Sequence, residues 1–351
     1  MTEVPPTPDQ APGVAGVHLD VESVLIPMRG RSGDVNYTLC VSSQVGCAMG
    51  CTFCETGQMG LIRSLTPAEI VAQWFAARHL LSHRVTNIVF MGMGEPLDNY
   101  ENVVQAIAVL KDHNGPNLSV SKICVSTVGR VDGLRKLAQQ MREPGWHRLG
   151  VALSLNHADD AGRSAIMPIN RKYALAELQQ ALIDIPVFGG GKLCIEYVLI
   201  PGVNDQREHA EKIAAFVAPI NEAYRSRPLR IEERAPVSRP GSPQAKDTQS
   251  AETLQSPGTD QISQTARTPR TMLNLIPYNP RRNSPWPAPS EESVDAFMGW
   301  LRDLGVYAKR RQTKGRTLMG ACGQLGSERI RKRTLVDLSV QGEAALGPVA
   351  T

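Results

Sequence analysis

The chain has 351 residues, of which 42% are hydrophobic and 21% charged, with a formal net charge of +4. This balance is typical of a globular protein with one large or two modest domains. No run of about 18 apolar residues occurs, which excludes a transmembrane helix. Residues 1–17 lack the basic start and apolar core of a secretory signal, so we expect a disordered leader on a cytoplasmic protein.

Short apolar strands alternate with amphipathic helices along the chain. One helix start is marked by Thr66 as N-cap, Pro67 and an early Glu69. The predicted strands span residues 38–41, 86–91, 122–126, 149–155, 193–200, 272–276 and 306–310. The predicted helices span residues 66–82, 102–112, 131–140, 175–183, 207–217 and 290–304. This alternation predicts an α/β fold of parallel βαβ units, either a partial (β/α)6 barrel or an open doubly wound sheet.

One stretch interrupts the alternation. Residues 225–271 are crowded with Ser, Thr, Gln, Pro and Arg, and cannot bury enough apolar area to offset the ordering entropy. We therefore predict a disordered insertion within a core of residues 18–330, followed by a tail of residues 331–351. Basic residues gather at 309–316 and 329–333, where they either neutralise phosphates or form a solubilising surface.

The strongest chemical signal is the loop that carries Cys47, Cys51 and Cys54 after a predicted strand. Seven cysteines without an export signal favour metal binding or catalysis over a disulfide scaffold. Soft thiolates select iron–sulfur clusters or zinc. A structural zinc site normally has a fourth ligand nearby, and no Cys or His follows within twenty residues. The spacing therefore predicts a 4Fe–4S cluster with one iron free of protein ligands, with zinc or free thiols as the alternatives.

A second signal is the Gly94-Glu95-Pro96 turn, directly after an apolar strand. Glycines there would let the backbone approach a ligand closely. A carboxylate at the end of a barrel strand can accept hydrogen bonds from an ammonium group. Gly-Glu-Pro also makes ordinary turns, but its position after the cysteine loop favours a binding role.

Six segments in one order carry a resemblance to a known family. They are CVSSQVGC (40–47), GMGEP (92–96), PINRKY (168–173), IEYVLIPGVND (195–205), NLIPYNP (274–280) and ACGQL (321–325). Together they resemble the RlmN/Cfr family of radical S-adenosylmethionine (SAM) RNA adenine methyltransferases, from about residue 22 to 325. Cys40 ahead of the cluster loop, together with Cys322, is particularly specific to that family. The resemblance implies a partial (β/α)6 radical SAM barrel with N- and C-terminal extensions.

The resemblance also implies cofactors and site residues. One 4Fe–4S cluster would be held by Cys47, Cys51 and Cys54, with SAM on the remaining iron. The positions that match SAM contacts are Gly94, Glu95, Ser126, Ser154, Leu155, Asn156 and Asn279. The catalytic positions are Cys322 as methyl acceptor, Cys40 as resolving thiol and Glu22 as general base.

The implied reaction methylates a ring carbon of adenosine, carbon 2 or less readily carbon 8. One SAM methylates Cys322, and a radical made from a second SAM removes a hydrogen from that methyl group. The methylene radical adds to the base, Glu22 removes the ring proton, and Cys40 releases the product by forming a disulfide with Cys322. The implied partners are ribosomal or transfer RNA and an electron donor such as flavodoxin or ferredoxin. We expect a monomer that does not bind membranes.

Other interpretations of these residues are open. Considered singly, Glu22 would be a surface carboxylate, and Cys40 or Cys322 a packing residue. Rival functions are a radical SAM enzyme with another substrate, a non-catalytic iron–sulfur RNA-binding protein and a redox sensor. Three features depart from the family: a short leader replaces a helical accessory domain, Asn156 stands where His is common, and the insertion has no counterpart.

Overall fold

The structure is a computed structural model that describes residues 19–29, 34–186, 193–226, 271–311 and 321–326. The predicted leader, the tail and all but the ends of the predicted insertion lie outside these residues. The domain division therefore stays a prediction.

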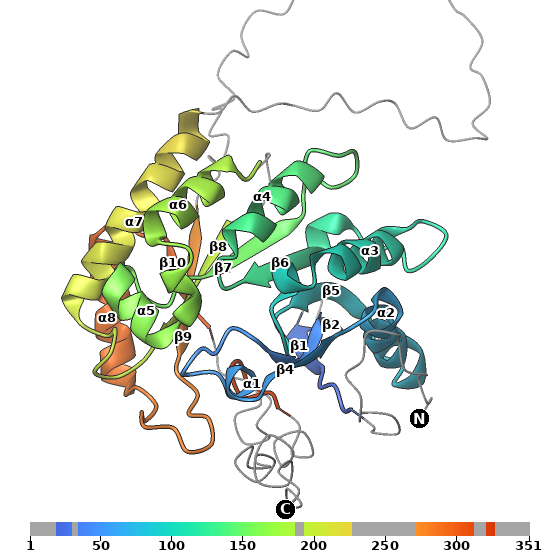
Figure 1. Ribbon diagram of the computed structural model, residues 1–351, viewed down its shortest axis with the longest axis horizontal. Helices are drawn as coiled ribbons and strands as arrows, with labels where there is room; N and C mark the ends of the chain where they lie inside the picture. Colours follow the sequence, from blue (N-terminus) through green and yellow to red (C-terminus); the bar gives the residue numbers. More distant parts are fainter. Residues whose placement is uncertain (1–18, 30–33, 187–192, 227–270, 312–320, 327–351) are drawn as a thin grey trace, which may run out of the picture.

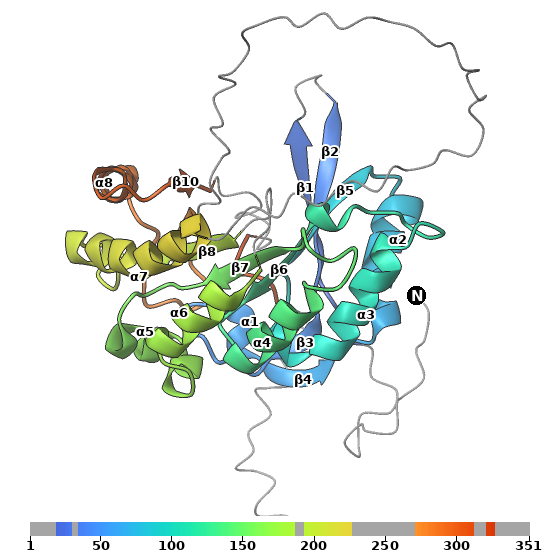
Figure 2. The same cartoon turned by 90° about the horizontal axis from the view of Figure 1, so that it is seen from above.

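A single eight-stranded sheet organises the described part of the chain, in the order β1-β2-β5-β6-β7-β8-β9-β10. From β2 to β10 neighbouring strands are parallel, and β1 joins the edge antiparallel to β2. The strands are β1 Val24–Arg29, β2 Val35–Cys40, β5 Val85–Phe90, β6 Ile123–Thr127, β7 Gly150–Ser154, β8 Leu193–Leu199, β9 Met272–Pro277 and β10 Ala308–Arg310. The sheet curls into a half-barrel (Figures 1 and 2), which confirms the partial barrel over the open sheet.

Helices cover the outer side of the curled sheet (Figure 2). They are α2 Pro67–Phe75, α3 Tyr100–Lys111, α4 Val131–Gln140, α5 Asp160–Ile166, α6 Leu175–Asp184, α7 Arg207–Ser226 and α8 Glu291–Asp303. The N-cap prediction is confirmed, since the Thr66 hydroxyl accepts from the Glu69 N–H and the Glu69 carboxylate from the Thr66 N–H. After α2 the chain continues as a π-helix, Ala76–Leu80.

Several elements were missed or misplaced by the sequence patterns. A small antiparallel hairpin of β3 (Gln44–Cys47) and β4 (Gly60–Ser64) frames the cysteine loop, with α1 (Glu55–Gln58) inside it. These elements, like α5, are too short to show a period. Helix α7 runs to Ser226, past its predicted end at 217 and into the predicted insertion. Its apolar stripe continues through buried Ile220 and Tyr224, which keeps the helix packed beyond Pro219.

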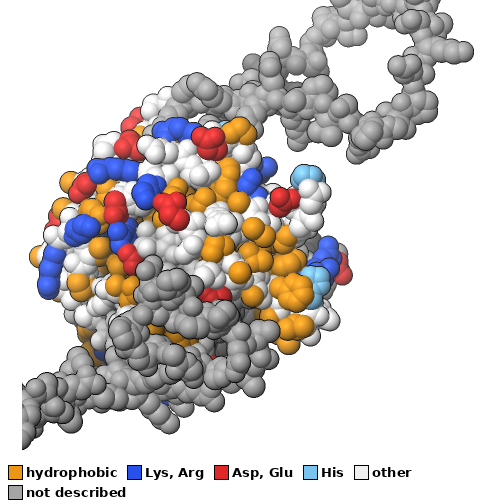
Figure 3. Space-filling view, turned by 45° about the vertical axis from the view of Figure 1, so that its right-hand side comes forward, with side chains coloured by type: hydrophobic (Ala, Val, Ile, Leu, Met, Phe, Trp, Pro, Cys, Tyr) orange, Lys and Arg blue, Asp and Glu red, His pale blue; other side chains and the backbone are white. Residues whose placement is uncertain are grey.

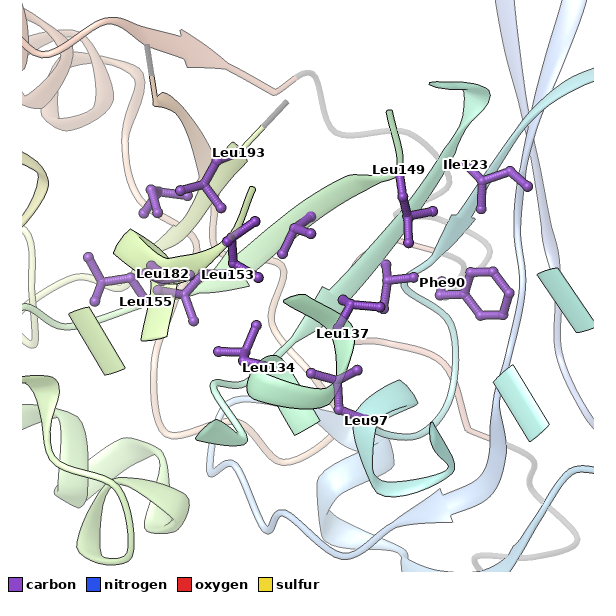
Figure 4. Close-up of a cluster of buried hydrophobic side chains, with 14 of the residues drawn as sticks. Phe90, Leu97, Ile123, Leu134, Leu137, Leu149, Leu153, Leu155, Leu182 and Leu193 are labelled. Atoms are coloured by element: carbon purple, nitrogen blue, oxygen red, sulfur yellow. The ribbon is translucent and has the colours of Figure 1, made fainter. Parts of the chain in front are cut away.

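The hydrophobic core lies between the sheet and these helices (Figure 4). Leu134 and Leu137 of α4 are buried beside strand residues such as Phe90 and Leu153. Each such side chain contributes roughly 1.5–3 kcal/mol by leaving water. None of the described helices is both long and apolar enough to span a bilayer. On the face in Figure 3, side chains of both charges are interspersed beside an area where hydrophobic side chains gather.

Candidate active site

The predicted site residues gather where the parallel strands end. Cys40 is the last residue of β2, Glu95 follows β5, Ser154 ends β7 and Asn279 follows β9. The carboxyl ends of parallel strands meet at one edge of a barrel, so residues far apart in sequence become neighbours there. This edge is therefore the candidate active site.

A cavity opens at this edge, and most predicted site residues line it. Of the predicted residues, the lining includes Cys51, Cys54, Gly94, Glu95, Ser126, Ser154, Asn156 and Cys322. Residues that were not predicted also line it, among them Met91, Glu196, Tyr278 and Arg311. The cavity lining does not include Glu22, Cys40, Cys47, Leu155 or Asn279.

The three cysteines of the loop lie together in an apolar setting. Cys47 pairs with Gly60 across the β3–β4 hairpin, and Cys54 is the N-cap residue of α1. Burial raises the pKa of Cys47 to about 12, and it raises the pKa values of Cys51 and Cys54 as well. Buried thiols of this kind ionise when a positive metal centre binds them. Among the described residues, no group of three His, Cys, Asp or Glu side chains is arranged to hold a single metal ion.

Gly92 and Gly94, at the Gly-Glu-Pro turn, pack closely against another segment of the protein. Gly94 has φ +99°, and a Cβ there would lie 2.6 Å from the Cβ of Gln44. A Cβ on Gly92 would lie 2.7 Å from the carbonyl oxygen of Val41. Gly94 does line the cavity, but the close approach that these glycines permit is to the segment leading into the cysteine loop.

Gln44 connects the two motifs directly. Its Oε1 accepts the backbone N–H of Glu95 at 2.9 Å, and its Nε2 donates to Asp98 at 3.1 Å. The backbone N–H groups of Ser43 and Gln44 both donate to the carbonyl of Met93, at 2.9 and 3.2 Å. Sequence reasoning missed Gln44, although it stands inside the CVSSQVGC segment.

Glu95 points its carboxylate into the site. Oε1 accepts the N–H of Leu97 at 3.0 Å, and Oε2 accepts the N–H of Val128 at 2.8 Å. The residue is only 2% exposed, and burial raises the pKa of its carboxyl group to about 7. A buried carboxylate held by two N–H groups is well placed to receive a ligand ammonium.

Asn156 uses its side chain to join strands. It adopts the left-handed region at φ +55°, which Asn tolerates better than most residues. Its Oδ1 accepts the N–H of Val198 at 2.9 Å, and its carbonyl accepts the side-chain amide of Asn204 at 2.6 Å. Asn156 therefore links the ends of β7 and β8 while lining the cavity.

The segment that carries Cys322 is held against the cysteine loop. The Glu55 N–H donates to the Gly323 carbonyl at 2.8 Å, and the Thr56 hydroxyl donates to Leu325 at 2.6 Å. Farther from the loop, the Asn279 amide lies 3.5 Å from the Cys322 carbonyl. These contacts place Cys322 at the cavity beside the region of the cluster ligands.

Cys322 is one of the groups that act on the Cys40 thiol. Burial, and after it the neighbouring Cys322, raises the pKa of Cys40 to about 12, whereas Arg311 acts in the opposite direction. The neighbouring Cys322, ahead of Glu196, in turn raises the pKa of Arg311. The Arg311 guanidinium lies 3.3 Å from the Glu196 carboxylate and 3.7 Å from the Met91 sulfur. Sequence reasoning missed this ion pair.

Comparisons with known proteins show the family of this chain. A family model described as the radical SAM superfamily matches residues 41–216. A relative from Protochlamydia amoebophila (strain UWE25), named "Probable dual-specificity RNA methyltransferase RlmN 1", is 38% identical, with 90% of this chain and 72% of that protein covered. A "Dual-specificity RNA methyltransferase RlmN" from Anaeromyxobacter sp. (strain Fw109-5) is 38% identical over 88% of this chain and 68% of that protein. This chain belongs to the RlmN family of the radical SAM superfamily.

A solved structure supports the RlmN-family assignment. The radical SAM methyltransferase from Sphaerobacter thermophilus shares 32% sequence identity, with a TM-score of 0.63 over 86% of this chain and 77% of that one. The assignment confirms the resemblance on which the expected fold rested.

Membership in the radical SAM superfamily implies a 4Fe–4S cluster and SAM, and the RlmN-family site fits both. Buried soft thiols beside an apolar wall match iron–sulfur ligation. Glu95 offers a buried carboxylate to an ammonium group, in a cavity that Cys51 and Cys54 also line.

Proposed function

We propose that this chain is a radical SAM methyltransferase that transfers a methyl group to carbon 2 of an adenosine in ribosomal or transfer RNA. The observation that carries the proposal is the placement of Cys322 and Glu95 on the cavity shared with Cys51 and Cys54. Cys322 is also one of the groups that raise the pKa of Cys40. The names of the RlmN relatives support RNA as the substrate.

Cys47, Cys51 and Cys54 would hold the cluster, and Glu95 would bind the ammonium of SAM. When bound, the cluster and SAM supply the methyl group and the radical that removes a hydrogen atom. The Cys322 thiolate accepts the methyl group and later carries the bond to the adenine ring. Glu22 takes the ring proton, and the Cys40 thiolate attacks the Cys322 sulfur, which gives a disulfide and releases methylated RNA.

The proposal extends to the setting of the reaction. A thiol reductant must reduce the Cys40–Cys322 disulfide after each turnover. We propose a cytoplasmic monomer that receives its electrons from a flavodoxin or a ferredoxin. An unpaired RNA loop suits the site, because the target base must leave its stack to reach Cys322.

The test uses the anaerobically purified holoenzyme with methyl-labelled SAM, a strong low-potential reductant and RNA that lacks modifications. We expect labelled 2-methyladenosine in digests of the RNA by mass spectrometry. Cys322→Ala should abolish the label in RNA, whereas Cys124→Ala, on β6 and outside the cavity lining, should retain it. Cys40→Ala should accumulate a protein–RNA crosslink. If the label is found only on the protein and never in RNA, whichever RNA is offered, the methyltransferase proposal is contradicted.

A further inference from the structure

Arg163 is a fully buried arginine behind the cofactor edge, with an exposed fraction of 0%. Its guanidinium donates to the carbonyl oxygens of Leu155 at 3.0 Å, Ser154 at 3.2 Å and Val128 at 2.6 Å. It also donates to the side-chain oxygen of Asn170 at 2.9 Å. One side chain of α5 thus joins the ends of β6 and β7.

Among the described residues, the positive charge of Arg163 forms no ion pair. All four of the acceptors that bind its guanidinium are neutral. Asp160 is the carboxylate that raises the pKa of Arg163. Its side chain, however, accepts hydrogen bonds from the Asn170 side chain and from the Leu175 N–H. Burying a guanidinium charge without a counter-charge costs free energy. We therefore expect a negative group to bind near Arg163.

The cysteine loop would supply the negative partner when its thiolates hold a cluster. The end of α5 contacts this loop, since the Ile166 carbonyl accepts the N–H of Thr52 at 3.0 Å. The Cys51 sulfur, which becomes negative when it ligates a metal centre, acts on Arg163 more strongly than Asp160 does. Burial lowers the pKa of Arg163 to about 10, which leaves it charged at neutral pH.

Arg163 is also linked to the Glu95 carboxylate through the backbone of Val128. The Val128 carbonyl oxygen accepts from Arg163, and the Val128 N–H, in the peptide group on the other side of its Cα, donates to Oε2 of Glu95 at 2.8 Å. The guanidinium therefore fixes the residue whose N–H holds Glu95.

We propose that Arg163 is a positioning residue that supplies the buried counter-charge to the iron–sulfur cluster and, through Val128, orients Glu95 toward the ammonium of SAM. The inference rests on the cluster and SAM assignment of the proposed function. One-electron reduction adds a negative charge to the cluster, so a fixed cation nearby stabilises the reduced form and raises its midpoint potential.

The test compares Arg163→Gln and Arg163→Lys with wild-type holoenzyme, prepared anaerobically and matched for iron and sulfide. Redox titration followed by electron paramagnetic resonance gives the midpoint potential, and calorimetry gives the Kd for SAM. We expect Arg163→Gln to lower the potential and to weaken SAM binding by about ten- to a hundredfold. Arg163→Lys keeps the positive charge but loses several hydrogen-bond donors. Its midpoint potential should therefore lie closer to the wild-type value than its affinity for SAM does.

The control is Arg135→Gln, which removes an exposed arginine of α4 that pairs with Glu177. It should change neither quantity. Wild-type potential and SAM affinity in Arg163→Gln would overturn the inference. If that variant does not fold, Arg163→Lys decides: weakened SAM binding at an unchanged potential supports the inference, and wild-type values for both overturn it.

Neither measurement uses RNA, so the inference and the proposed function can fail separately. A holoenzyme that binds SAM but methylates no RNA contradicts the proposed function and leaves the role of Arg163 standing.

Discussion

The carboxylate of Glu22 accepts a hydrogen bond from the backbone N–H of Gly326 at 2.8 Å, across 304 positions of the chain. The Glu22 carbonyl also accepts the hydroxyl of Ser42 at 2.7 Å. Glu22 therefore connects the N-terminal edge of the sheet to the segment that carries Cys322. This contact is consistent with a positioning role and with the proposed role as general base. The two roles predict different effects of substitutions at Glu22.

We expect Glu22→Gln to keep the hydrogen bond to Gly326, because an amide oxygen can still accept it. Methylation of Cys322 should then stay near the wild-type rate, while methylated RNA forms about 10²- to 10⁴-fold more slowly without a base. Glu22→Ala should slow both steps, since the Cys322 segment loses an anchor. Mass spectrometry of the protein and of digested RNA separates the two steps. Identical behaviour of the two variants would contradict a base role.

Substitution of Arg311 and substitution of Glu196, the two partners of one ion pair, should change the reactivity of Cys322 differently. Arg311→Gln removes the cation beside Cys322, so alkylation of this thiol by iodoacetamide at a fixed pH should slow by roughly fivefold. Glu196→Gln leaves the cation without its carboxylate and should keep or increase the rate. Peptide mass spectrometry measures alkylation at Cys322 alone. A similar slowing in both variants would indicate loss of packing instead.

SAM binding should depend on pH through Glu95, whose pKa is raised to about 7 by burial. Below this value the carboxyl group is protonated and cannot pair with an ammonium, so affinity falls as the pH decreases. For a pKa near 7, the apparent Kd should be about tenfold weaker at pH 6 than at pH 8. Glu95→Gln should bind weakly at each pH and retain only the pH dependence of SAM itself. Calorimetry over this range tests the prediction.

Gly94→Ala should destabilise the fold by about 2–5 kcal/mol, because it combines left-handed strain with overpacking. Its φ is +99°, and the new Cβ would lie 2.6 Å from Gln44. Gly202 is the matched control, with φ +72° and open space around a Cβ. Gly202→Ala should cost about 1–2 kcal/mol from strain alone. Chemical denaturation measures both, and equal losses would show that the contact with Gln44 adds nothing.

The sequence alone determined the features that depend on neighbours along the chain. Apolar runs located the seven parallel strands, Thr66 and Glu69 marked a helix start, and the spacing of Cys47, Cys51 and Cys54 indicated a cluster loop. In each case the chemistry acts over a few residues, through local hydrogen bonds, a repeating period or the reach of one loop.

Only the tertiary structure decided which distant side chains complete the site. Arg163 lay outside every predicted element, in a helix too short to show a period. Glu196 stood in one predicted strand and Arg311 just after another, without any shared pattern. Their partners lie across strand ends that the curled sheet brings together. A buried charge is placed by the groups around it in space, and no short-range pattern records those groups.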